Sequence, residues 1–335
     1  MRKRFYAIPI LLLVLFTLMI TAFIYYGFKN VLADTGQETG IIAPDNEPTY
    51  HFAMICQNTD DPFWLSIKKG VELASHEFNV AVEYNGPRSS NVDEELKYLQ
   101  IAIASKVDGI ACHVPDEDQT LGFINKAVGS GIPVVTVQTD AKDSLRVSFI
   151  GANMYDFGIR LGKMLESATD GVTNAVILMN GNQNGGSTIQ NLIISGIKDA
   201  AKQYPKMKIQ AVQLTDDEFL GAEDKVKSIL EDQPEVDTVL CTSERDTIGI
   251  AQLLVDLNKV GYNVIGYGES ATVLRYINNG VIYGTVTGNP EKIGYDAIKA
   301  LVDVKRNGRT SAYYPVELQA ITRGNVQEYI TPDKK

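Results

Sequence analysis

Short apolar runs alternate with amphipathic stretches along the chain from Tyr50 onward. The runs are rich in Val and Ile and are bounded by Gly, Pro, Asn and Asp, a pattern typical of buried strands. In the stretches between them, apolar residues return every three or four positions, which is typical of helices packed on one side. Phe63, Ile67, Val71 and Ala74 form one such stripe. The pattern therefore predicts repeated β–α–β units.

These periods predict the positions of the individual elements. Strands are expected at 51–56, 80–84, 109–113, 133–137, 147–150, 175–179, 208–214, 238–241, 264–267, 282–286 and 313–320. Helices are expected at 62–78, 92–105, 119–128, 155–167, 188–203, 222–231, 246–257, 273–278 and 290–305. Because 335 residues exceed one compact domain, the expected fold is α/β with two doubly wound parallel-sheet lobes.

Polar loops follow most of the predicted strands, among them QNTDDPFW, VPDED, QTD, TSERD and GES. In open parallel sheets, ligands bind beyond the carboxyl ends of the strands, so two lobes place a ligand in the cleft between them. Asn, Asp, Ser and Thr hydrogen-bond hydroxyl and amide groups, but they are also the usual helix N-caps. Capping is the better explanation for any single loop, whereas the whole set favours ligand binding.

The loop QNTDDPFW contains the only tryptophan of the chain. Asp60 is expected to cap the helix that begins at Pro62, since proline is favoured at the first helical position. Asp61 is then the candidate hydrogen-bonding partner of a ligand. Phe63 continues the apolar stripe and is expected to be shared with the core, which leaves Trp64 as the better candidate for stacking on a ligand.

The N-terminal segment contains an uncharged apolar run from residue 7 to residue 28 that follows the sequence Met-Arg-Lys-Arg. This length is sufficient to span a bilayer, and the basic flank orients the N-terminus toward the cytoplasm. We therefore expect residues 1–33 to be a transmembrane anchor, 34–49 a flexible linker, and the folded part to be extracytoplasmic. The alternative is a cleaved signal peptide ending at Ala33, although the apolar run is longer than a usual signal core.

Charge and cysteine usage narrow the possible partners. The first 33 residues hold four of the 31 basic residues and none of the 41 acidic ones, so the remainder has a formal charge near −14. Such an acidic chain is unsuited to binding nucleic acid.

Cys56, Cys112 and Cys241 are expected to be buried small apolar residues, with a Cys56–Cys112 disulfide as the alternative. No His/Cys spacing indicates a metal site.

Neither catalysis nor a cofactor is indicated. The three histidines lie apart and no G-x-S-x-G sequence is present. The glycine-rich loop GNQNGGS matches neither the dinucleotide nor the P-loop pattern. A surface carbohydrate-active enzyme using Asp60 and Asp61 remains the alternative to a binding protein.

From about residue 50 to residue 320, the chain resembles the periplasmic sugar-binding proteins of the ribose-binding type, which share the LacI-like effector fold. The resemblance lies in NTDDPFW, GSGIPVVTVQTD, FIGANMYDFGIRLG, QNLIISGIKDA, VIGYGES, INNGVIYGTVTGNPEKIGYDAI and PVELQAIT. It implies a first lobe of residues 50–152 and 289–313, a second of 153–288 and 314–330, and a three-segment hinge between them. Ligands close such lobes by hinge motion.

The resemblance also implies a set of ligand-binding residues. Phe63 and Trp64 would sandwich a sugar, and the residues matching other family positions are Asp61, Gln138, Asn191, Phe219, Ser243 and Tyr267. Three positions depart from the family pattern: Gln138 and Gly268 stand where Asp is common, and Gly288 where Gln is. The groups that could replace these anchors are Asp140, Asp217, Glu244, Arg245 and Glu269.

The expected function is therefore a membrane-anchored, extracytoplasmic solute-binding protein that closes over a small polar ligand, a carbohydrate by resemblance. Two partners are left open, an ABC permease for uptake or a sensor histidine kinase for signalling. The predicted anchor, with no lipid-attachment cysteine after it, favours the kinase.

Overall fold

The computed structural model describes residues 40–180, 188–215, 226–228, 231–232, 234–259 and 261–330. The predicted transmembrane segment, the linker up to residue 39, most of the predicted helix 222–231 and the candidate site residue Phe219 lie outside these residues. Within the described ranges, no helix is both long and apolar enough to cross a bilayer. Residues 42–335 form one compact unit that contains both lobes described below.

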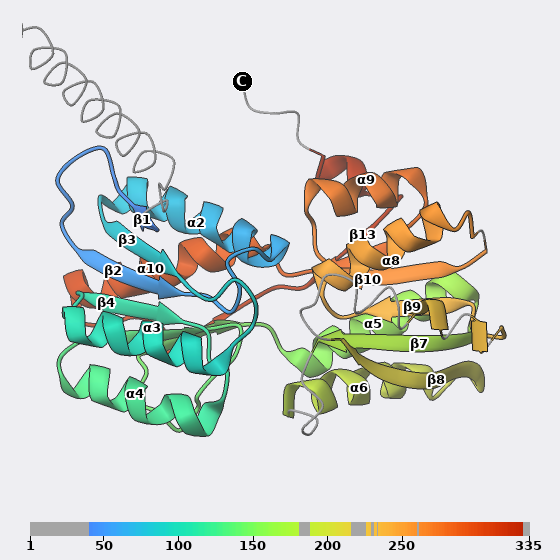
Figure 1. Ribbon diagram of the computed structural model, residues 1–335, viewed down its shortest axis with the longest axis horizontal. Helices are drawn as coiled ribbons and strands as arrows, with labels where there is room; N and C mark the ends of the chain where they lie inside the picture. The colour runs from blue at the N-terminus through green and yellow to red at the C-terminus, as the bar shows by residue number, and fades with distance from the viewer. Residues whose placement is uncertain are drawn as a thin grey trace, which may run out of the picture. The chain divides into compact units, whose positions relative to one another are not determined.

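The first lobe is built on a sheet with the strand order β1-β3-β2-β4-β5-β6-β12. The strands are β1 (Ile41–Ile42), β2 (His51–Ile55), β3 (Ala81–Asn85), β4 (Gly109–Cys112), β5 (Val134–Val137), β6 (Ser148–Gly151) and β12 (Tyr313–Pro315). From β3 to β12, every neighbouring pair is parallel. Helices α2 (Pro62–Phe78) and α10 (Pro290–Asn307) cover one face, and α3 (Val92–Ser105) and α4 (Glu117–Gly129) cover the other (Figure 1).

The second lobe repeats this plan with the strand order β13-β11-β10-β9-β7-β8. Its strands are β7 (Val172–Asn180), β8 (Lys206–Thr215), β9 (Thr238–Cys241), β10 (Asn263–Tyr267), β11 (Gly284–Thr287) and β13 (Gln319–Thr322). Helices α5 (Met154–Thr169) and α6 (Thr188–Ala201) cover one face, and α8 (Glu244–Asp256) and α9 (Ala271–Asn279) cover the other (Figure 1). A short 3₁₀ helix, η1 (Val326–Glu328), follows β13.

The predicted α/β fold with two parallel-sheet lobes is confirmed, and several elements have their predicted bounds. Helices 62–78 and 92–105 and strand 238–241 begin and end where the apolar period starts and stops. The second sheet is not wholly parallel, because β13 pairs with β11 in the antiparallel direction. The three cysteines are buried and free, and burial raises the pKa of the Cys56 and Cys112 thiols to about 12.

The prediction of one final strand over 313–320 is wrong. The chain forms two strands there, β12 parallel to β6 in the first sheet and β13 antiparallel to β11 in the second. The residues between them connect the lobes, with the Val316 N–H donating to the Gly151 carbonyl oxygen at 3.0 Å. The hydrophobic pattern of 313–320 carries no sign that the chain changes sheets there. The other two connections run from β6 to α5 and from β11 to α10.

Helix α2 is held very close to α10 through glycine. A Cβ atom at Gly70 would lie 1.7 Å from the Glu291 carbonyl oxygen, and one at Gly294 would lie 2.1 Å from that of Ile67. Helices α5 and α6 meet in the same way, since a Cβ at Gly158 would lie 2.2 Å from the Ile193 carbonyl oxygen. In the first lobe, this contact holds α2 and therefore the loop at its N-terminus, where several predicted site residues lie.

Candidate functional site

The loop after β2 presents Asp61 at the start of α2. Asp61 has an extended backbone, and its Oδ1 accepts from the Phe63 N–H at 2.9 Å, while Pro62 occupies the first helical position. The N-cap is therefore Asp61, and the expectation of Asp60 in this role is wrong. The reason is geometric, because the cap must immediately precede the first helical residue to reach the free N–H groups of the first turn. The Asp60 N–H instead donates to Asn58 Oδ1 at 2.8 Å.

The two aromatic residues of this loop face different neighbours. Trp64 is 2% exposed, and its ring lies edge-on to His113 with 5.6 Å between ring centroids. His113 Nδ1 and Glu95 Oε2 lie 2.8 Å apart in a buried hydrogen bond. Phe63 is 7% exposed and lies 5.5 Å from the ring of Tyr267, which belongs to the second lobe. Phe63 is thus the aromatic residue of this loop that contacts the opposite lobe.

Tyr267 joins the two lobes at the carboxyl end of β10. Besides Phe63, its ring contacts Phe157 of α5 edge-on at 5.5 Å. Gln138, which follows β5 of the first lobe and has a left-handed backbone with φ of 67°, lies near the Tyr267 hydroxyl. Burial, and then the nearby carboxylates of Glu244 and Glu269, raise the pKa of this hydroxyl above its usual range, whereas Gln138 acts to lower it.

A charged pair also crosses between the lobes. Asp61 Oδ2 lies 3.8 Å from Arg245 Nε, and the two side chains are 17% and 24% exposed. Because both side chains are partly buried, solvent screens this pair less than it screens an ion pair on an open surface. Asp61 thus caps its helix with one carboxylate oxygen and faces the second lobe with the other.

Two buried polar atoms at these loops have no hydrogen-bond partner among the described residues. They are Asn58 Nδ2 on the first lobe and Glu244 Oε2 on the second. Asn58 is 2% exposed and Glu244 is 1% exposed. Buried polar atoms are almost always paired, so such exceptions are candidates for contact with a ligand. The sequence pattern did not single out Asn58, and the only available signal was its position directly after a buried strand.

Three predicted site residues have other local surroundings. Asp140 accepts hydrogen bonds from Arg146 Nη2 at 2.6 Å and Thr136 Oγ1 at 2.8 Å, so its carboxylate is occupied within its own lobe. Ser243 caps α8, accepting from the Asp246 N–H at 3.2 Å. Asn191 lies near the N-terminal end of α6 and is exposed.

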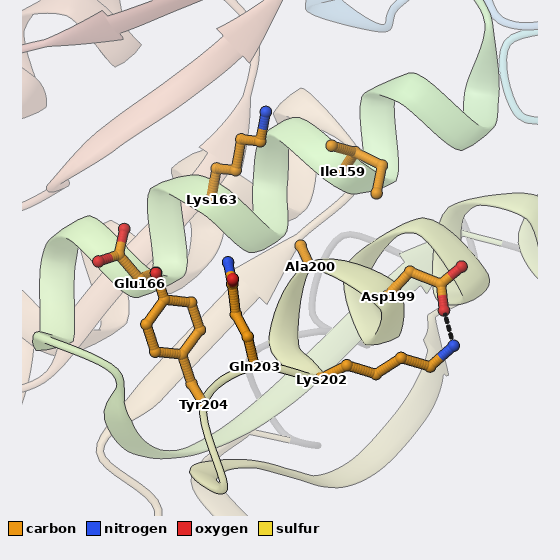
Figure 2. A pocket seen from close by; sticks show the side chains of 8 residues that line it. All are labelled: Ile159, Lys163, Glu166, Asp199, Ala200, Lys202, Gln203 and Tyr204. Carbon is orange, nitrogen blue, oxygen red and sulfur yellow. Dashed lines mark ion pairs between the residues drawn. The ribbon is translucent and has the colours of Figure 1, made fainter.

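Two surface hollows lie apart from these loops. Figure 2 shows the first, of about 410 Å³, between α5 and α6; it is lined by Ile159, Lys163, Glu166, Asp199, Ala200, Lys202, Gln203 and Tyr204. Lys202 Nζ and Asp199 Oδ1 form an ion pair there at 2.5 Å. The second, of about 640 Å³, is lined by Asp303, Asn307, Arg309 and Thr310. No predicted site residue lines either hollow, so both are separate from the candidate site.

The candidate site is therefore the place where the loops of the two lobes meet. Direct contacts connect five of the predicted residues, namely Asp61, Phe63, Trp64, Arg245 and Tyr267. The site combines aromatic faces with a guanidinium group, an amide and carboxylates. Such groups can stack on and hydrogen-bond a small polar molecule.

Comparisons with known proteins identify the family of this chain. Residues 52–309 match the model of the periplasmic binding protein domain. The D-allose-binding periplasmic protein of Escherichia coli is 22% identical over 270 residues, which is 77% of this chain and 85% of that protein. The ribose import binding protein of the same organism is 21% identical over 81% of this chain and 90% of its own length.

Solved structures show the same likeness. A glucose-galactose binding protein from Geobacillus stearothermophilus is 31% identical with a TM-score of 0.73, covering 84% of this chain and 99% of that one. A structure of the XylFII-LytSN complex contains a chain 29% identical with a TM-score of 0.75, at 83% and 99% coverage. The named relatives are binding proteins, which confirms the prediction that this chain is not an enzyme. The chain belongs to the periplasmic binding protein family.

Proposed function

We propose that this protein is an extracytoplasmic receptor whose two lobes close over a carbohydrate. The observation that carries the proposal is the meeting of the lobes at the carboxyl ends of both sheets, where Phe63 contacts Tyr267 and Asp61 faces Arg245. Aromatic faces suit the apolar faces of a sugar ring, and charged or amide groups suit its hydroxyls. The relatives named above bind allose, ribose, glucose and galactose, which supports a sugar as the ligand.

Titration of intrinsic fluorescence tests this proposal, because Trp64 is the only tryptophan of the chain. The full-length chain, kept in mild detergent, is titrated with D-glucose, D-galactose, D-ribose, D-allose and D-arabinose. We expect at least one sugar to change Trp64 emission saturably, since closure around the sugar alters the surroundings of the Phe63–Trp64 pair. The same sugar is expected to raise the melting temperature in a parallel thermal unfolding experiment.

Two outcomes would contradict the proposal in different ways. A sugar that raises the melting temperature without altering Trp64 emission would place the ligand away from this loop. Five sugars without effect on either measurement would argue against a carbohydrate receptor.

For the partner, we propose ABC-type uptake or signalling through a membrane kinase, with the chain held at the membrane by residues 7–28. The E. coli relative named for ribose import supports uptake. The XylFII-LytSN complex supports the second version, because a protein of similar fold assembles with another protein there. The uncharged apolar run supports the anchor in either version.

Mass spectrometry of the native chain from its own membranes tests the anchor. We expect the intact mass to include residues 1–33 and the protein to remain in the membrane fraction after a high-salt wash. Salt removes proteins held by surface charge but not a spanning helix. A mature chain that starts at Asp34 would instead show a cleaved signal peptide.

A further inference from the structure

Glu244 is a buried acid, and the described residues hydrogen-bond only one of its two carboxylate oxygens. It is the first residue of α8, and its Oε1 accepts from the Ser270 N–H at 2.8 Å. Its Oε2 has no hydrogen-bond partner among the described residues, although the side chain is 1% exposed. A carboxylate at a helix N-terminus is favourable on the surface as well, so helix stability alone does not explain its burial.

The position of this carboxylate depends on a neighbouring glycine. A Cβ atom at Gly268 would lie 2.4 Å from Glu244 Cδ, so the Glu244 carboxyl fills the space that a side chain at position 268 would need. Gly268 also has φ of 110°, a conformation that other residues rarely adopt. The absence of a side chain there brings Glu244 to the end of β10, next to Tyr267.

The charges around Glu244 come from three elements. Burial is the largest cause that raises the pKa of the Glu244 carboxyl, and Asp61 at the start of α2 and Glu269 in the loop after β10 raise it further. The hydrogen bonds from Ser270 act in the opposite direction, and the resulting pKa is about 7. Glu269 Oε2 itself accepts from Thr287 Oγ1 at 2.9 Å. Arg245, on α8, is paired with Asp61 across the lobes. Three carboxylates beside one guanidinium group disfavour an anionic ligand and favour one that offers hydroxyl hydrogens.

We propose that Glu244 is a ligand-binding residue of the site, and that its Oε2 accepts a hydrogen bond from a hydroxyl of a neutral polyhydroxylated ligand. This inference rests on the proposed function and adds a residue to it. It also assigns a purpose to the unpaired oxygen, since the ligand completes the hydrogen bonds that the protein leaves open.

The first test compares binding by the wild type and Glu244→Gln at pH 6 and pH 8, using the five sugars named above and Trp64 emission. The Glu244 carboxylate must be charged to accept the hydroxyl hydrogen, and pH 6 lies about one unit below its pKa. The wild type should therefore bind about ten-fold more weakly at pH 6 than at pH 8. Glu244→Gln is expected to bind at least about ten-fold more weakly at pH 8 and to show no difference between the two pH values. Glu166→Gln, on the far hollow between α5 and α6, serves as the matched control and should bind like the wild type.

The second test measures thermal unfolding without sugar. The folded-state pKa of Glu244 lies above its ordinary value of 4.5, so the charged form destabilises the folded chain increasingly as pH rises from about 4.5 to about 7. Glu244→Gln removes that charge and should raise the melting temperature by a few degrees at pH 8 and much less at pH 5. A purely structural role for Glu244 predicts the opposite, a lower melting temperature for Glu244→Gln at pH 8.

The outcomes separate this inference from the proposed function. A wild type that binds one of the sugars, together with a Glu244→Gln variant that binds it equally well, would overturn the role of Glu244 alone. A wild type that binds none of the five would contradict both. Tighter wild-type binding at pH 6 than at pH 8 would overturn the assignment of Glu244 as a charged acceptor.

Discussion

Gly70→Ala is expected to lower the free energy of unfolding by about 3 kcal/mol, the cost of overpacking a tight contact between elements. The added methyl group would lie 1.7 Å from the carbonyl oxygen of Glu291 and 2.8 Å from the Tyr295 nitrogen. Both are backbone atoms of α10, so no side chain can rotate to make room and the helices must separate. Separation would expose part of the core that Ile67 and Val71 build with α10.

Gly122→Ala is the matched control, because the same substitution in α4 meets no atom within 4 Å. It should stabilise the chain by about 0.5 to 1 kcal/mol, since alanine favours the helix over glycine. Urea unfolding followed by circular dichroism measures both variants, and an unchanged slope with urea shows that the same surface is exposed. Equal midpoints for Gly70→Ala and the wild type would show that α2 and α10 can move apart at little cost.

Asp61→Asn is expected to weaken sugar binding by about ten-fold or more while changing the melting temperature by no more than about two degrees. Asparagine caps a helix as well as aspartate does, so the bond to the Phe63 N–H is retained. The substitution removes the charge that faces Arg245, and losing one partner of a buried charged pair costs about 2 to 5 kcal/mol. We expect the lower end of that range, because both side chains are partly exposed to water.

Asp61→Ala separates the two roles of this residue. It should lose the binding affinity that Asp61→Asn loses and, in addition, about 1 kcal/mol of stability from the missing cap. Isothermal titration calorimetry with the sugar that alters Trp64 emission, combined with thermal unfolding, provides both measurements. If Asp61→Asn binds as tightly as the wild type, the cross-lobe pair makes no contribution to closure over the sugar.

Much of the candidate site was visible in the sequence because it lies in one continuous loop. Asp61, Phe63 and Trp64 follow a buried strand and begin a helix, and these two patterns together place them at the carboxyl end of the first sheet. The period of the apolar residues also indicated that Phe63 belongs partly to the core, as its burial shows. Local patterns of this kind can be recognised from residues that are close together in the sequence.

The division of roles within that loop was not visible. The sequence favoured Trp64 for contact with a ligand, whereas in the folded chain Phe63 is the residue that touches Tyr267, and Trp64 rests on His113. The two rings are adjacent in sequence and equally apolar. The direction in which each ring points depends on His113 for Trp64 and on Tyr267 for Phe63, which are about 50 and 200 positions away in the chain. The period of apolar residues carries no information about such distant neighbours.

Hydrophobic period and capping chemistry were enough to predict the α/β class, the two lobes, the approximate bounds of most helices and the polar loops at the strand ends. Three features became visible only in the folded chain: the strands into which 313–320 divides, the position of Arg245 facing Asp61, and the Glu244 carboxyl in the space left at Gly268. Each of these depends on atoms brought together by packing across long separations in the chain. In the sequence, Gly268 thus looks like the loss of a ligand-binding side chain. In the folded chain, the same glycine leaves the space that the Glu244 carboxyl occupies.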